Sequence, residues 1–83
     1  MSDFYLGEIR AFPFGFAPSG WAPCEGQMLP ISANTALFSL LASMYGGDGK
    51  SSFALPTLDP LPAETGTLQY CIAFQGEYPQ RPQ

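Results

Sequence analysis

The run that comes nearest to a chemical site in this chain is MYGGDGKS, at residues 44–51. It ends in the Gly-Lys-Ser of phosphate-binding loops, but a methionine stands where such loops have their first glycine. A phosphate-binding loop also follows a strand and opens a helix, whereas this run follows a helical pattern and precedes prolines. We therefore predict a tight structural loop in which Asp48 bonds back to backbone amides. The residues that form it are Gly46, Gly47, Asp48 and Gly49, with positive φ at the glycines.

Other metal and acid-base chemistry finds little support in the sequence. The chain has no histidine, so Ser-His-Asp and Cys-His arrangements cannot form. Two cysteines are too few for a structural zinc, and the acidic residues fall in expected loops. Calcium at Asp48 stays open as an alternative. We otherwise expect no cofactor, no metal site and no enzyme activity.

Cys24 and Cys71 leave two interpretations open. They could form a bridge, or they could be two buried thiols that pack as small apolar side chains. Free cysteine is often interior, which favours the thiols. Trp21, the only tryptophan, could stack on a sugar, but a lone tryptophan in so small a domain is typical of the core or of a subunit interface.

Charge is scarce in this chain of 83 residues. Charged residues make up 12% of it and the net charge is −4, whereas about 25% charged residues is usual for a soluble domain. Nucleic acids and anionic membranes need clustered basic residues, so we expect neither as a partner. We expect no membrane insertion, and synthesis in the cytoplasm without a signal peptide. The apolar share of 46% predicts a homo-oligomer.

Apolar residues between positions 37 and 44 recur with the i, i+3, i+4, i+7 spacing of one helix face. We predict an α-helix from about Ala33 to Tyr45, with Ser32 or Asn34 as its N-cap. Gly46 is expected to close it in the left-handed conformation. The side chains expected in the core, besides Trp21, are Leu37, Leu40, Leu41 and Met44.

Two strand patterns lie near the ends of the chain. Gly7 to Phe12 is a short candidate, and the alternation from Leu68 to Phe74 puts every large apolar side chain on one face. A turn at Glu25-Gly26 predicts a small hairpin before the helix, and the three prolines of FALPTLDPLPAETG predict an extended connector. Together these patterns predict a small α+β domain, in which one helix packs on short antiparallel strands and long ordered loops.

Six short motifs follow one another along the first two thirds of the chain. They are Gly7-Glu8-Ile9-Arg10, Gly20-Trp21-Ala22-Pro23-Cys24-Glu25-Gly26-Gln27, Leu29-Pro30-Ile31, Leu37-Phe38-Ser39-Leu40-Leu41, Tyr45-Gly46-Gly47-Asp48-Gly49 and Phe53-Ala54-Leu55-Pro56. In this order and spacing the chain resembles the phage tail collar domain, in the branch of the microcystin-dependent proteins. The resemblance covers roughly Phe4 to Leu58.

The resemblance implies a small α+β fold that works by assembly, and it implies no enzyme. The chain departs from the family's pattern after Leu58, where Asp59-Pro60 replaces the usual continuation into a long distal region. The stretch from Leu68 to Pro79 nevertheless resembles the family's own C-terminal strand. We expect one minimal collar domain over 1–83, with collar motifs at 1–58, a connector at 59–66, a C-terminal strand at 67–76 and a tail at 77–83.

These features predict a structural, self-assembling subunit of a phage-tail-like fibre or an extracellular filament. Its expected partners are copies of itself, in a filament or a trimer, and other tail or fibre proteins. Its expected location is the virion or an extracellular appendage. The alternative is a small adhesin or carbohydrate-binding module that contacts its ligand through Trp21 and the tyrosines.

The two terminal strands predict how copies join. At least one of them lies at a sheet edge, and the C-terminal strand carries no charge from Leu68 to Gly76 that would guard such an edge. A segment that adds to a neighbour's sheet makes a head-to-tail contact, which repeats as a ring or as a filament. The candidate assembly surface consists of Phe4, Tyr5, Leu6, Tyr70, Ile72, Phe74 and Tyr78.

Overall fold

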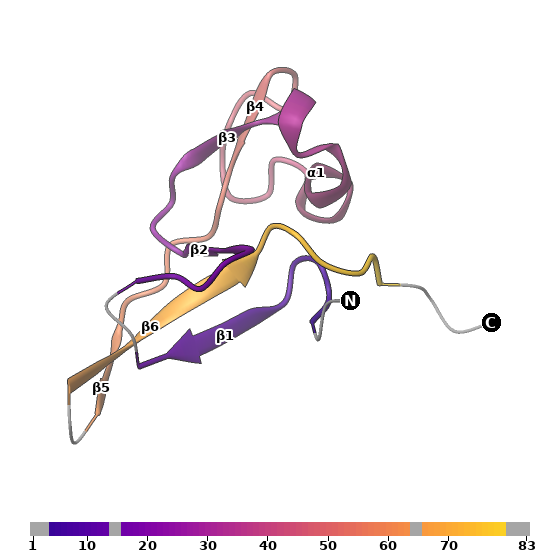
Figure 1. The fold of residues 1–83 in the computed structure, drawn as a ribbon. Helices are drawn as coiled ribbons and strands as arrows, with labels where there is room; N and C mark the ends of the chain where they lie inside the picture. Colours follow the sequence, from indigo (N-terminus) through magenta and orange to yellow (C-terminus); the bar gives the residue numbers. More distant parts are fainter. Residues whose placement is uncertain (1–3, 14–15, 64–65, 80–83) are drawn as a thin grey trace.

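Short antiparallel strands and one α-helix make up the fold in the computed structural model, which describes residues 4–13, 16–63 and 66–79 (Figure 1). The prediction of a small α+β domain is confirmed. In chain order the elements are β1 (Ile9–Phe12), β2 (Trp21–Pro23), β3 (Met28–Pro30), a 3-10 turn (Ile31–Ala33), α1 (Thr35–Leu41), β4 (Ser52–Ala54), β5 (Leu61–Ala63) and β6 (Gly66–Ala73).

The strand β6 is the centre of the main sheet. It pairs antiparallel with β1 and with β2, so that Ile72 lies opposite Ile9 on one side and opposite Ala22 on the other. Its first residues pair with β5, which lies within the stretch predicted as a connector. The expectation that the C-terminal strand presents an unguarded edge is therefore wrong. A strand with neighbours on both sides needs no charge to prevent further pairing.

A second, two-stranded sheet is formed by β3 and β4, with Leu29 opposite Phe53. The same antiparallel register continues to a bridge between Glu25 and Thr57. The predicted hairpin at Glu25-Gly26 is wrong, because β2 finds its partner in β6 and β3 finds its partner in β4. Figure 1 shows β3, β4 and α1 together on one side of the main sheet.

The helix α1 is shorter than predicted. Asn34 is its N-cap residue, although its side chain donates to the carbonyl of Pro30 instead of capping. The helix ends at Leu41, because Ala42 takes a left-handed conformation with φ of 51°. The prediction that Gly46 closes the helix is wrong, and so is the placement of Met44 in the core. Met44 lies beyond the last helical turn and is 74% exposed.

Alternation along β6 divides the apolar side chains between two clusters. Ile72 belongs to the larger cluster, which lies between the main sheet and α1 and contains Leu6, Cys24, Leu37, Phe53 and Leu55. Its neighbours Cys71 and Ala73 point to the opposite face and pack with Trp21. Leu40 and Leu41 are partly buried against the larger cluster. Both faces of β6 are therefore covered, as expected for a central strand.

Candidate assembly surface

The seven residues predicted as an assembly surface separate into three groups. Leu6 and Ile72 are 6% and 0% exposed, so their assignment to an outer surface is wrong. Ile72 points into the core because the regular apolar face of β6 is its inner face, and Leu6 joins the same cluster from the segment before β1. Phe4, Tyr70 and Phe74 are half-buried. Tyr5 and Tyr78 are the two that are exposed, by 55% and 45%.

Tyr5 lies where the first and last described segments are tied together. The Leu6 amide donates to the Glu77 carbonyl at 2.8 Å, and the Glu77 amide donates to the Phe4 carbonyl at 3.2 Å, which makes a parallel bridge between Tyr5 and Glu77. The two segments approach so closely that a Cβ on Gly76 would lie 3.0 Å from the Phe4 carbonyl oxygen. This contact fixes the backbone beneath both exposed tyrosines.

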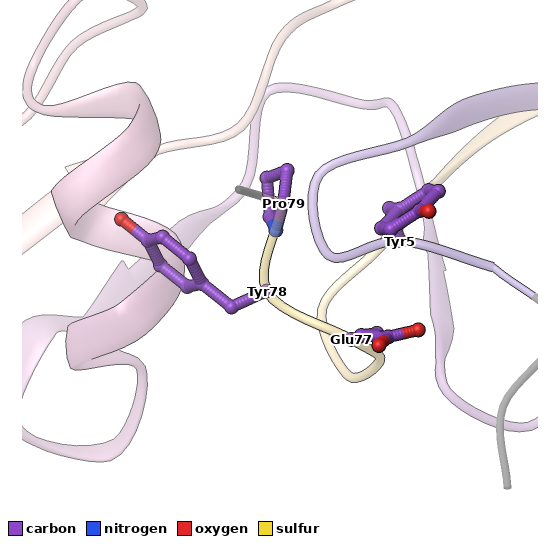
Figure 2. A pocket seen from close by; sticks show the side chains of 4 residues that line it. All are labelled: Tyr5, Glu77, Tyr78 and Pro79. Atoms are coloured by element: carbon purple, nitrogen blue, oxygen red, sulfur yellow. The ribbon is translucent and has the colours of Figure 1, made fainter. Parts of the chain in front are cut away.

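A pocket opens at this junction, lined by Tyr5, Glu77, Tyr78 and Pro79 (Figure 2). The ring of Tyr78 reaches toward α1, where its hydroxyl lies 2.7 Å from Ser39 Oγ. Because Ser39 Oγ already donates to the Ala36 carbonyl, the hydroxyl of Tyr78 is the donor in this bond. Glu77 and Tyr5 lie on the other side of the pocket.

Sequence reasoning missed Glu77, Pro79 and Ser39 as parts of this site. Glu77 and Pro79 fall in the predicted tail at 77–83, and Ser39 enters the sequence analysis only as part of a collar motif. The available signal is the Glu-Tyr-Pro run directly after the C-terminal strand, since tyrosine beside proline offers two flat apolar surfaces. The structure shows that the run is held in place, by the backbone bridge to Tyr5 and by the hydrogen bond from Tyr78 to Ser39.

The outer edge of β1 is a second surface of interest. The Ala73 amide donates to the Glu8 carbonyl, so the antiparallel register turns the backbone groups of Arg10 toward β6 and those of Ile9 and Ala11 away from it. The side chain of Ile9 is 40% exposed. Within the part of the chain that the structure describes, β1 pairs with β6 and with no other strand. It is therefore an edge strand.

The side chain of Glu8 fixes the bend that leads into β1. It accepts a hydrogen bond from the Tyr5 amide at 3.0 Å and pairs with Arg10. These two contacts, the amide first, hold the pKa of Glu8 below its usual value. Arg10 also lies 5.7 Å from the centroid of the Trp21 ring, on the face of the sheet opposite α1.

The glycine-rich loop after α1 is organised by Asp48. Its Oδ1 accepts from the amides of Lys50, Ser51 and Ser52 at 2.8 to 3.0 Å, and its Oδ2 accepts from Ser51 Oγ. The hydrogen bonds, that from the Lys50 amide first, hold the pKa of this carboxyl well below its usual value. The loop amides that could bind a phosphate thus donate to Asp48 instead. The carboxylate oxygens that could bind calcium already accept these hydrogen bonds. Gly46, Gly47 and Gly49 have positive φ.

Trp21 and the cysteines lie inside the protein. Trp21 is 6% exposed and packs against Phe4 and Phe12, with ring centroids 4.9 and 5.0 Å apart, so it cannot serve as a sugar platform. Cys24 and Cys71 are buried thiols in different clusters, on opposite faces of the sheet. Burial first, and then Cys71, raise the pKa of Cys24 to about 11. Among the described residues no group of three or more His, Cys, Asp or Glu is placed to hold a metal.

Comparison with protein families gives one decisive match. The model of the phage tail collar domain matches residues 7–60. The chain belongs to the phage tail collar domain family. No curated protein and no solved structure matches the chain. Tail collar domains are structural parts of phage tail fibres, and membership therefore implies a virion component.

The matched range of this collar domain includes β1 to β4 and α1, but it stops before β5 and β6. The central strand of the main sheet therefore comes from residues beyond the match. Tyr5 and the segment from Glu77 to Pro79 also lie outside the matched range, so the pocket is built from the flanks of the collar motifs. In the described ranges no helix has the length and apolar character needed to cross a membrane.

Proposed function

We propose that this chain is a structural subunit that assembles with copies of itself, in a phage-tail-like fibre or an extracellular filament. Membership in the collar family supports a role in a fibre. The observation that carries the self-assembly is the outer edge of β1, where Ile9 and Ala11 turn their backbone groups away from the sheet.

An open strand edge is a template for another strand, and monomeric proteins guard such edges with lysine, proline or inward-pointing charge. The charged residue of β1, Arg10, lies over Trp21 and pairs with Glu8, so it does not guard the edge. Pro13 follows the strand and limits an added strand to about the length of β1, since proline lacks an amide donor. An added strand would also cover Ile9.

The surface as a whole supports association. Large apolar side chains that are at least 40% exposed occur on several elements, and charged residues are scarce. If the added strand comes from a segment other than β1, the contact is head-to-tail and repeats as a filament or closes as a ring. Pairing of β1 with β1 would instead give a closed dimer. The exposed residues are Tyr5, Ile9, Phe16, Met28, Met44, Tyr45, Leu61 and Tyr78.

Sedimentation velocity and electron microscopy of the full chain test this proposal. We expect species larger than a dimer at micromolar concentration. Ile9→Lys, which puts a charge on the edge of β1, is expected to reduce them to smaller species. Ser43→Lys, at an exposed position after α1, is the matched control and should assemble normally.

A wild-type chain that stays monomeric up to hundreds of micromolar would overturn self-assembly. Normal assembly of Ile9→Lys would show that copies join elsewhere.

A further inference from the structure

The pocket between the two tied segments offers a distinct combination of side chains. The rings of Tyr5 and Tyr78 and the ring of Pro79 give it apolar walls, and Glu77 gives it a negative charge (Figure 2). Aromatic surfaces of this kind take extended proline-containing segments, whose rings lie flat on them. A carboxylate beside such a surface favours a segment that also carries a cation.

The pocket is already organised before any ligand arrives. The parallel bridge between Tyr5 and Glu77 holds its floor, and Gly76 allows the two backbones to touch. The hydrogen bond from Tyr78 to Ser39 holds one wall against α1. A site with fixed walls loses little conformational entropy on binding, so even a small contact area can contribute to affinity.

The cation that would complete the pocket does not come from the described part of the chain. The chain has three cations, Arg10, Lys50 and Arg81. Of the two in the described residues, Arg10 pairs with Glu8, and Lys50 belongs to the loop after α1. Arg81 is the third, and it lies in the segment that directly follows the pocket.

The sequence of that segment has the chemistry that the pocket would recognise. Residues 79–82 read Pro-Gln-Arg-Pro, a proline-x-x-proline spacing with an arginine inside it. Proline fixes its own φ, and the residue before a proline is restricted to extended conformations, which here applies to Arg81. Arg81 comes two residues after Pro79, which lines the pocket, and a return to Glu77 of the same copy would need a turn that this extended preference disfavours. A neighbouring copy is then the nearest acceptor.

We propose that this pocket binds residues 80–83 of a second copy of the same chain. Pro82 packs on the rings of Tyr5 and Tyr78, and the guanidinium of Arg81 pairs with the carboxylate of Glu77. Each copy supplies one pocket and one segment, so the contact either repeats head-to-tail or closes as a reciprocal exchange between two copies. This inference rests on the proposed self-assembly and adds a second contact between copies, apart from the outer edge of β1.

Charge reversal in the full chain tests the pairing. Glu77→Arg and Arg81→Glu should each weaken self-association on the order of tenfold, because each sets like charges against each other. The two variants mixed one to one should recover it, since every pocket then meets a segment of opposite charge. The readout is the association constant from sedimentation. The matched controls are Asp59→Arg and Lys50→Glu, at exposed positions outside the pocket, and both should associate like wild type.

We expect self-association to recover both in the mixture and in the double variant that carries Glu77→Arg and Arg81→Glu in one chain. Recovery in the double variant alone would mean that the segment binds its own pocket, and it would overturn the proposal. If the wild type assembles and both single variants associate normally, the proposal is also overturned. The proposed function is not affected by that result. A glycan array tests the alternative of a carbohydrate site. If the wild type binds a sugar, and Glu77→Arg loses that binding while its self-association is unchanged, the pocket is a carbohydrate site and the proposal is overturned.

Discussion

At the level of single residues, Gly47 is the described glycine whose added Cβ would come closest to backbone atoms. Its φ is 94°, and a Cβ at this position would lie 2.5 Å from Phe53 Cα and 2.6 Å from the Ser52 carbonyl oxygen. Both contacts are with the backbone of β4, which cannot move aside without breaking its pairing with β3. The loop after α1 is thus closed onto the second sheet at this residue.

We predict that Gly47→Ala lowers the free energy of unfolding by on the order of 3 to 5 kcal/mol, through overlap with β4. Gly49→Ala is the matched control. Its φ of 72° is also left-handed, but its Cβ would meet Ser43 at an ordinary 3.5 Å, so only the backbone cost of about 1 to 2 kcal/mol applies. Urea denaturation measures both. Equal losses would contradict the steric argument.

The buried thiols predict a specific dependence of stability on pH. Burial raises the pKa of Cys24 from an ordinary 9.0 to about 11 in the folded protein. The thiolate is disfavoured in the folded state, so the stability contributed by this group is complete below pH 9 and is lost as the pH rises toward 11. The loss should be on the order of 1 to 3 kcal/mol, as measured by urea denaturation in reductant.

Cys24→Ala should flatten this decline of the unfolding free energy with pH.

Because Cys24 and Cys71 lie on opposite faces of the sheet, Ellman's reagent should find two thiols in unfolded protein and react slowly with native protein. If unfolded protein reacts with the reagent only after a reductant is added, the two cysteines form a disulfide, which would contradict the placement of these residues.

At the scale of elements, α1 presents one buried side chain to the main sheet. Leu37 is 1% exposed and belongs to the larger cluster, whereas Met44, seven residues on, is 74% exposed. We predict that Leu37→Ala costs on the order of 2 to 5 kcal/mol of unfolding free energy, because it leaves a cavity under the sheet. Met44→Ala should change stability by less than about 0.5 kcal/mol. Thermal denaturation of the two variants compares them, and a comparable loss in Met44→Ala would mean that the helix continues past Leu41.

At the scale of the whole molecule, the first and last described segments contribute both to the core and to the proposed assembly pocket. Leu6 lies in the larger cluster, and the Glu77 backbone holds it there. We therefore expect deletion of either segment to unfold the domain as well as to remove the pocket. Side-chain substitutions at Ile9, Glu77 and Arg81 separate the two effects.

We predict that the melting temperature of the wild-type chain rises by several degrees between 1 and 100 micromolar, because assembly binds the folded state and not the unfolded one. Differential scanning fluorimetry over that range measures it. Ile9→Lys should have a smaller dependence on concentration. A melting temperature that stays constant across the range in the wild type would argue against self-assembly.

Features that depend on neighbours along the chain could be predicted from the residues alone. The loop at Asp48 follows from glycines that permit positive φ and from a short carboxylate that reaches the next amides. The alternation in β6 assigned its large apolar side chains to one face, and the apolar spacing located α1 near Leu37. The collar motifs indicated the family to which the chain belongs.

Strand pairing and the choice of the inner face depend on contacts between segments that are distant in the sequence. β2 and β3 carry no local signal that β6 and β4, about 50 and 24 residues away, are better partners than each other, since pairing energy comes from cross-strand contacts. The position of β6 between two strands turned Ile72 from a candidate surface residue into a core residue. For the same reason the pocket could not be read from the chain, because its walls come from segments some 70 residues apart that only the bridge of Tyr5 with Glu77 brings together.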